Sequence, residues 1–257
     1  MEAVVIGKLA FFAAVALGIG AEIAAAAEVK VLTAGAMRKV VDALVPEFQK
    51  QSGHQVTVTN DTVGALSRRI QGGEAFDVAV VTPAAVADLA GKGKVVDGSG
   101  VNLARVGVGV MVKAGAPRPD ISSVEAFKQA LLAAKTVAYI DPASGGSSGI
   151  YFNGLLEKLG IAAEIKPKAK LKQGGYVAEL IVSGEAELGV HQISEIVPVQ
   201  GVTLVGPLPP EIQNFTVYAA GIGTAASDAE AAKAFIRALA GPAAAQVLKG
   251  QGMEPAS

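Results

Sequence analysis

The sequence predicts an α/β fold of two lobes, each a mostly parallel sheet flanked by helices, with two hinge strands joining the lobes. From Glu28 onward, short apolar segments that read as strands alternate with amphipathic helical segments, which is typical of parallel sheets covered by helices. Two longer apolar runs, residues 105–112 and 215–222, stand where the chain would leave the first lobe and return to it. We therefore expect lobe 1 to comprise residues 28–112 plus 215–257, and lobe 2 residues 113–214.

The composition limits the kind of protein and its partners. With 257 residues, 51% of them hydrophobic, the chain can form one large or two medium domains. The formal net charge of −1 argues against a nucleic-acid partner, because phosphate binding needs a basic surface. Cysteine is absent, which excludes disulfides and thiol catalysis.

The first residues have the three-part layout of a secretory signal peptide. Lys8 precedes an apolar run at residues 9–20, and four alanines at residues 24–27 suit cleavage before Glu28. An uncleaved membrane anchor is the alternative, but the run is short for a span of roughly 20 apolar residues. We predict that residues 1–27 are a signal peptide and that the mature protein is periplasmic.

Three strands, each followed by a helix, build the predicted first lobe. The strands are residues 29–32, 55–59 and 77–81. Small polar turns follow them at residues 33–36, 60–64 and 82–83, and helices begin at these turns. The two C-terminal helices, predicted at residues 228–239 and 242–250, return to this lobe.

The second lobe begins after residues 113–120, which are rich in Pro, Gly and charge and suggest a change of lobe. Strands are predicted at residues 136–140 and 188–191, helices at residues 150–159 and 177–183, and a lysine-rich, solvated strand face at residues 166–172. A Gly-Glu-Ala sequence precedes the strand at residues 77–81 in lobe 1 and the strand at residues 188–191 in lobe 2, which indicates that the two lobes are similarly built.

The turns after the strands are candidate anion-binding loops. Carboxyl ends of parallel strands share one edge of a sheet, where free backbone N–H groups and helix dipoles favour negative charge. One such turn alone is more often a solvated capping loop, so the prediction depends on several turns converging on one cleft. The predicted binding residues are Gly35, Ala36, Met37, Val63, Gly64, Thr82, Ser147, Ser148, Gly175, Tyr176 and Gln192.

Several segments resemble the periplasmic molybdate-binding protein family, and the resemblance covers essentially the whole mature chain. They are residues 37–49, 73–78, 89–96, 141–142, 149–151, 184–189 and 241–244. The resemblance implies the two-lobed periplasmic binding protein fold, with a small anion held between the lobes. It also implies delivery of that anion to an ABC permease at the inner membrane. We expect a monomer without a cofactor.

The chain departs from that family's pattern at three positions. The resemblance implies hydroxyl donors from two serines and a tyrosine, and the matching residues here are Ala36, Gly64 and Gln192. Each lost hydrogen bond to a charged group is worth roughly 1.5–3 kcal/mol. The smaller residues also predict more space on the lobe 1 side of the cleft, which suits a small carboxylic acid better than molybdate.

One branch of the wider family resembles a periplasmic aconitate isomerase, so a second function stays open. Isomerisation needs a base beside a carbon acid, and His191, Glu195 and Tyr151 are the candidates. Among these His191 is the first choice, because imidazole titrates near neutral pH. The alternative for His191 is a strand-end residue satisfied by the backbone, and we favour binding over catalysis. Arg38, beside the first turn, could pair with a ligand carboxylate or face water.

The sequence offers little for other chemistries. His54 and His191 are its two histidines and lie far apart, so we expect no metal site. A Gly-x-Ser-x-Gly nucleophile turn is absent from the sequence, which argues against an acyl hydrolase.

Overall fold

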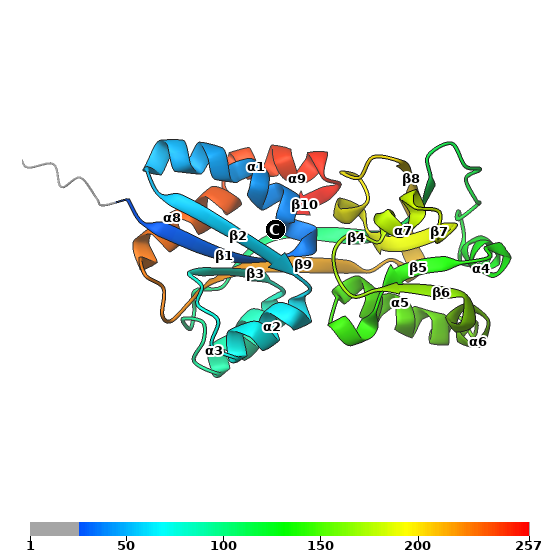
Figure 1. Ribbon diagram of the computed structural model, residues 1–257, viewed down its shortest axis with the longest axis horizontal. Coiled ribbons are helices and arrows are strands. Elements are labelled where there is room, and N and C mark those ends of the chain that lie inside the picture. Colours follow the sequence, from blue (N-terminus) through cyan, green and yellow to red (C-terminus); the bar gives the residue numbers. More distant parts are fainter. Residues whose placement is uncertain (1–25, 257) are drawn as a thin grey trace, which may run out of the picture.

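The computed structural model describes residues 26–256, which form two α/β lobes placed end to end (Figure 1). The predicted signal peptide lies outside the described residues, except for Ala26 and Ala27. Within residues 26–256 no helix is both long and apolar enough to cross a membrane.

The sheet of lobe 1 has the strand order β2-β1-β3-β9-β4. The first three strands are parallel to one another, whereas β9 is antiparallel to both β3 and β4. Strand β10 pairs with the outer edge of β4. The strands are β1 (Glu28–Ala34), β2 (Gln55–Asp61), β3 (Val78–Val81), β4 (Val101–Lys113), β9 (Phe215–Ile222) and β10 (Met253–Pro255).

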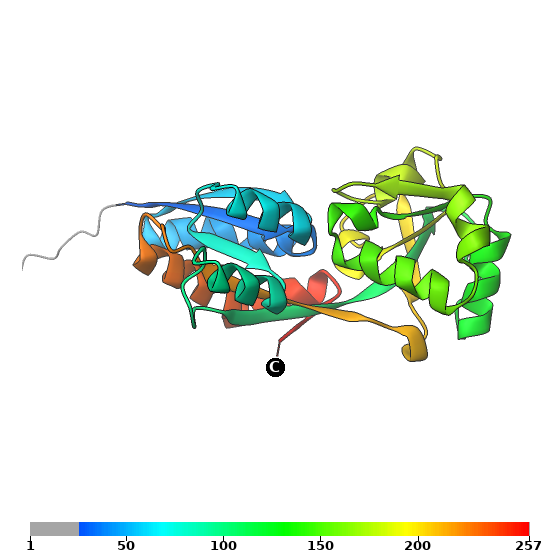
Figure 2. The same cartoon turned by 90° about the horizontal axis from the view of Figure 1, so that it is seen from below.

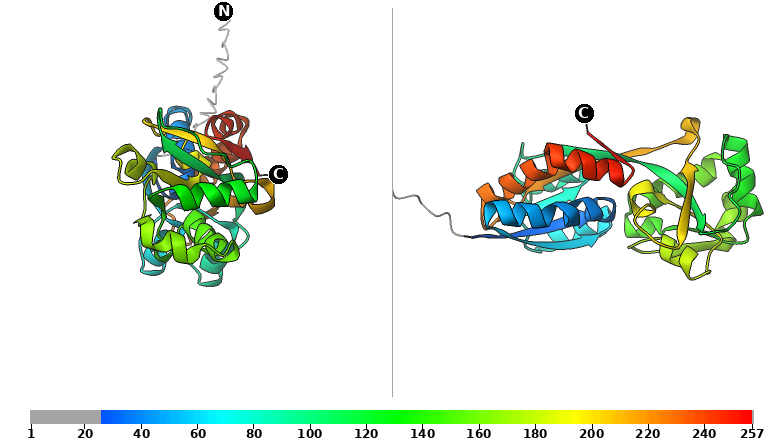
Figure 3. Two further views of the ribbon diagram at one scale, coloured as in Figure 1. Left: turned by 90° about the vertical axis from the view of Figure 1, so that its right-hand side faces the viewer. Right: turned by 90° about the horizontal axis from the view of Figure 1, so that it is seen from above.

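Helices cover both faces of this sheet (Figure 1). Successive residues of a strand point to opposite faces, so Val78 and Val80 pack under one layer while Ala79 and Val81 pack under the other. One layer contains α1 (Gly35–Ser52), α8 (Ala229–Ala240) and α9 (Pro242–Gly250), and Figure 3 shows α8 and α9 lying alongside α1. The other contains α2 (Val63–Gln71) and α3 (Pro83–Gly91). The C-terminal helices therefore return to lobe 1, as predicted.

Lobe 2 has its own sheet, in the order β8-β4-β7-β5-β6, with β5 parallel to both β6 and β7. Its strands are β5 (Val137–Ile140), β6 (Ala169–Lys172), β7 (Leu188–Gln192) and β8 (Val202–Pro207). Helices α4 (Val124–Ala133), α5 (Ser147–Lys158) and α6 (Ala162–Ile165) pack on one face, and α7 (Ala178–Val182) packs on the other. Short 3-10 turns are η1 (Pro142–Ser144), η2 (Lys166–Lys168), η3 (Ile193–Glu195) and η4 (Pro210–Ile212).

Strand β4 runs through both lobes. Its residues 101–107 pair with β9, and residues 108–112 pair with β7 of lobe 2 (Figure 2). The chain returns to lobe 1 just before β9. There the Gln213 side chain accepts from the Val108 N–H and donates to the Val108 carbonyl, both at 2.9 Å. Gly107 leaves room for this amide, because a Cβ there would lie 3.1 Å from Gln213 Nε2. Two neighbouring segments thus connect the lobes.

The structure confirms the predicted α/β class and the parallel pairing, and it also adds elements that the sequence patterns did not indicate. These are β8, β10 and α6. Strand β8 is half-buried without a clear alternation, and β10 and α6 span only three and four residues. Because β4 belongs to both sheets, the lobe division after residues 112 and 214 remains a proposal.

Asp77 is a buried carboxylate that joins three parts of lobe 1. It is 2% exposed and accepts the N–H of Lys30 on β1 at 2.6 Å. Its other oxygen accepts the N–H and hydroxyl of Ser227 before α8, at 2.6 and 2.9 Å. These bonds compensate the cost of burying the charge.

We expect Asp77→Ala to lower the free energy of unfolding by about 3 kcal/mol, because three donors lose their acceptor. Urea denaturation followed by circular dichroism measures this change. Asp97→Ala, at an exposed turn, is the matched control and should change stability little. Equal stability of the two variants would contradict the role given to Asp77.

Candidate functional site

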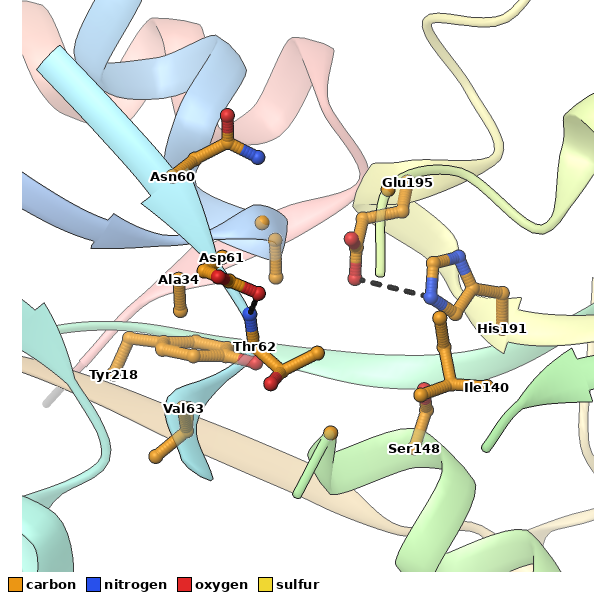
Figure 4. Close-up of a pocket in the computed structure, with 14 residues that line it drawn as sticks. Ala34, Asn60, Asp61, Thr62, Val63, Ile140, Ser148, His191, Glu195 and Tyr218 are labelled. Atoms are coloured by element: carbon orange, nitrogen blue, oxygen red, sulfur yellow. Dashed lines mark hydrogen bonds and ion pairs between the residues drawn. The ribbon is translucent and has the colours of Figure 1, made fainter. Parts of the chain in front are cut away.

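A small cavity lies between the lobes, at the carboxyl ends of β1 and β2 in lobe 1 and of β5 and β7 in lobe 2 (Figure 4). Its volume is about 30 Å³, which is room for one or two water molecules. A larger ligand therefore requires the lobes or their side chains to move. The lining residues are Ala34, Gly35, Ala36, Asn60, Asp61, Thr62, Val63, Ile140, Gly146, Ser148, Gly175, His191, Glu195 and Tyr218.

Helix N-termini from both lobes face this cavity. Helix α1 begins after Ala34 and α5 begins after Gly146, and neither first turn has a side-chain cap. The first N–H groups of a helix have no partner within it and carry the positive end of the helix dipole. Helix α2 differs, because the Thr62 hydroxyl accepts from the Ala65 N–H. Two uncapped helix starts on opposite walls make the cavity suitable for an anion.

The structure brings only part of the predicted set to the cavity. Gly35, Ala36, Val63, Ser148 and Gly175 line it, as does His191. The other predicted residues do not line it, and their role in binding stays a prediction.

Those other residues have different tasks in the structure. Met37 is fully buried in the core of lobe 1, and the Thr82 hydroxyl caps α3 through the Ala85 N–H. Ser147 lies beside Tyr218 at the start of α5. The Tyr176 hydroxyl is buried without a hydrogen-bond partner.

Gln192 joins a buried network at the hinge. Its amide accepts from the Tyr218 hydroxyl at 2.8 Å and donates to Thr216 Oγ1 at 2.9 Å. This network links β7 of lobe 2 to β9, and it presents Tyr218 to the cavity. Sequence reasoning missed Tyr218, because a single tyrosine within an apolar hinge strand gives no pattern that distinguishes it from core.

Gly64 does not enlarge the cleft, which corrects the expectation of extra space there. The backbone of lobe 2 fills the position of the missing side chain, and a Cβ on Gly64 would lie 2.7 Å from the Cα of Gly145. The Gly64 N–H donates to the Gly145 carbonyl at 3.1 Å, and the Thr62 hydroxyl donates to the Ser144 carbonyl at 2.6 Å. The start of α2 therefore holds the two lobes together.

His191 and Glu195 form a buried pair on the lobe 2 wall (Figure 4). His191 Nε2 lies 3.4 Å from Glu195 Oε2, and the two residues are 1% and 8% exposed. Burial raises the pKa of Glu195 to about 8 and lowers the pKa of His191 to about 3. His191 Nδ1 has no hydrogen-bond partner, so the backbone does not satisfy this side chain.

Two acidic residues line the cavity, and neither cancels the positive helix ends. Glu195 is mostly protonated at neutral pH because of its raised pKa. Asp61 accepts from the Thr62 N–H at 2.8 Å and lies 3.5 Å from the Arg69 guanidinium. The negative charge of Asp61 is therefore compensated by Arg69 and the Thr62 N–H, which both belong to lobe 1.

Two side chains that the sequence suggested as a base or as a partner for a ligand carboxylate, Tyr151 and Arg38, do not line the cavity. Tyr151 donates its hydroxyl to the Ile212 carbonyl within lobe 2. Arg38 is exposed and is bonded to Asn60 and Asp42. Among residues 26–256, no group of three or more His, Asp or Glu side chains could hold a metal ion.

Residues 29–254 match the family model described as bacterial extracellular solute-binding protein. The chain belongs to this family. Its members are exported proteins that bind a solute. The fold, with two lobes around one cavity, agrees with that assignment.

Two relatives and one solved structure are similar over most of this solute-binding protein. An aconitate isomerase of Pseudomonas sp is 31% identical over 231 residues, which cover 88% of this chain and 87% of the relative. A molybdate-binding protein of Azotobacter vinelandii is 30% identical over 255 residues, or 93% and 95% of the two chains. The structure of an Azotobacter vinelandii periplasmic molybdate-binding protein matches with a TM-score of 0.75 at 20% identity, covering 89% of this chain and all of the other.

We expect Gly64→Ala to disturb the contact between the lobes, because backbone atoms of Gly145 cannot yield to a new methyl group as a flexible side chain would. Amide hydrogen exchange should become faster in peptides covering residues 59–67 and 140–147. Gly154→Ala on α5, where a Cβ meets no atom within 4 Å, is the control. Unchanged exchange in Gly64→Ala would show that the lobes do not depend on this contact.

Proposed function

We propose that this protein binds a small organic anion with two or more carboxylates between its lobes and delivers it to the permease of an ABC importer from the periplasm. The observation that carries the proposal is the pair of uncapped helix starts, α1 in lobe 1 and α5 in lobe 2, on opposite walls of one cavity. A ligand with negative groups at both ends can meet both helix termini at once.

The side chains around the cavity favour a carboxylate over a fully ionised tetrahedral oxyanion. On the lobe 1 wall, Ala36 provides no hydroxyl donor. Gly64 is in contact with the backbone of Gly145 in lobe 2, so it offers no donor to a ligand. A protonated Glu195 instead offers an O–H group that can donate a charge-assisted hydrogen bond to a ligand carboxylate oxygen. The relatives named for molybdate binding and for aconitate isomerisation both support a small anion as the ligand class.

A second function, isomerisation of an unsaturated tricarboxylate, is favoured by the His191–Glu195 pair and by the relative named aconitate isomerase. In this reaction a base removes a proton from the methylene carbon, the allylic electron pair shifts, and a proton is added at the other end of the former double bond. A base works best when its pKa is near the working pH. With pKa values of about 8 and about 3, the ionised form of Glu195 is a stronger base than His191, the first choice from the sequence.

Binding is tested by a thermal-shift screen of molybdate, sulfate and a series of di- and tricarboxylates. We expect a tricarboxylate to raise the melting temperature, because a ligand that binds the folded state stabilises it. Ser148→Asp places a negative charge at the start of α5 and should abolish the shift. Ser122→Asp, on an exposed loop, should keep it. The proposal fails if no carboxylate stabilises the wild-type protein.

Catalysis is tested by incubating the protein with cis-aconitate and separating the products by chromatography. If the second function holds, trans-aconitate accumulates, and Glu195→Gln reduces the rate at least a hundredfold, the usual scale of general base catalysis. Absence of trans-aconitate at high protein concentration would leave binding as the function.

A further inference from the structure

The Glu195 carboxyl reaches from lobe 2 to the first turn of α1 in lobe 1. A Cβ on Gly35 would lie 2.5 Å from Glu195 Oε1, so a larger residue at this position would require the carboxyl oxygen to shift. Figure 4 shows the side chain pointing into the cavity, with one oxygen toward His191. Glu195 therefore occupies the wall that an anion bound at α1 would contact.

The groups around Glu195 include no strong cation. His191 on β7 is the direct partner, and the other titratable groups nearby are Tyr218 on β9, Tyr176 before α7 and Asp61 on β2. No Lys or Arg is among the residues that line the cavity in the described part of the chain.

The nearest basic group on α1 is engaged elsewhere. Arg38 and Asp42 on this helix lie close enough to Tyr176 to influence its titration. Arg38 is bonded to Asn60 and lies 3.4 Å from Asp42, and its side chain is half exposed. It therefore does not neutralise Glu195.

An ionised Glu195 would oppose a bound anion. Two like charges at close distance repel, and they repel more strongly at a buried site than in water because the dielectric constant is lower. A protonated carboxyl instead donates a hydrogen bond to a carboxylate, and a hydrogen bond with an ionised acceptor is stronger than one between neutral groups. His191 is uncharged near neutral pH, so it supplies no compensating charge.

We infer that Glu195 contacts the anion in its protonated form and donates a hydrogen bond to one ligand carboxylate, so that binding is coupled to the uptake of a proton. The inference rests on the proposed function and deepens it, since it assigns Glu195 as the residue that must be protonated when the anion is bound. Burial already raises the pKa of Glu195 to about 8, and the bound anion raises it further. Affinity is therefore fully present below pH 8 and is lost as the pH rises through this value.

The test is calorimetric titration of the wild-type protein with tricarballylate, a saturated tricarboxylate that cannot be isomerised. Between about pH 7 and pH 9.5 we expect the Kd to be constant at first and then to rise by up to tenfold per pH unit. Repeating the titration in buffers of different ionisation enthalpy counts the protons. The uptake should be about half a proton per ligand near pH 8 and close to one above pH 9.

Two variants identify the group that carries the proton. Glu195→Gln keeps a donor without a charge, so its Kd should be independent of pH over this range and its proton uptake should vanish. Glu164→Gln, at an exposed position of α6, makes the same chemical replacement away from the cavity and should retain the wild-type profile.

The outcomes separate this inference from the proposed function. Binding of tricarballylate with a flat Kd and no proton uptake overturns the inference alone, as does a pH profile that persists in a folded Glu195→Gln. If Glu195→Gln does not fold, the proton count of the wild-type protein decides. Absence of binding across the whole pH range overturns the proposed function together with the inference.

Discussion

The site depends on the unsatisfied backbone N–H groups at the starts of α1 and α5. Parallel strands bring these helix starts to one edge of each sheet, and the hinge places the two edges face to face. Because neither helix has a side-chain cap, the positive ends remain available to a ligand. The contact between Gly64 and Gly145 holds the two lobes together, and the Glu195 carboxyl contributes to the charge of the cavity.

Close approach between the lobes is achieved with glycine. Gly64 and Gly145 bring two backbones together at the rim, and Gly35 leaves room for a carboxyl oxygen from the opposite lobe. Gly145 also has φ of 80°, in the left-handed region that favours glycine. Glycine thus allows close backbone approach at these two points, and Glu195 and Tyr218 are among the polar side chains that face the cavity.

The sequence was sufficient to predict the α/β class, because strand and helix patterns alternate clearly and the turns carry small polar residues. The second hinge run, residues 215–222, matches β9 as the structure has it. Contacts between distant segments were not predictable. From the sequence, Gly64 was interpreted as a position that had lost a ligand-binding serine. In the structure, glycine is needed there because the backbone of Gly145, 81 positions later in the chain, lies too close for a side chain. The turn at residues 60–64 was predicted to face the cleft, although Asn60 and Asp61 were not named as binding residues. Tyr218 was not predicted, since its exposure to the cavity follows from lobe packing and not from any local pattern.

The position of β9 in the sheet has a consequence for the order in which the protein can fold. Strand β9 lies between β3 and β4, although more than a hundred residues separate it from each of them in sequence. Until β9 is in place, β3 has an open edge and lobe 1 cannot complete its core, whereas the strands specific to lobe 2 all lie within residues 137–207. Long-range pairing of this kind is slow, so we expect lobe 2 to gain structure first and the central strand of lobe 1 to be the last large element to assemble.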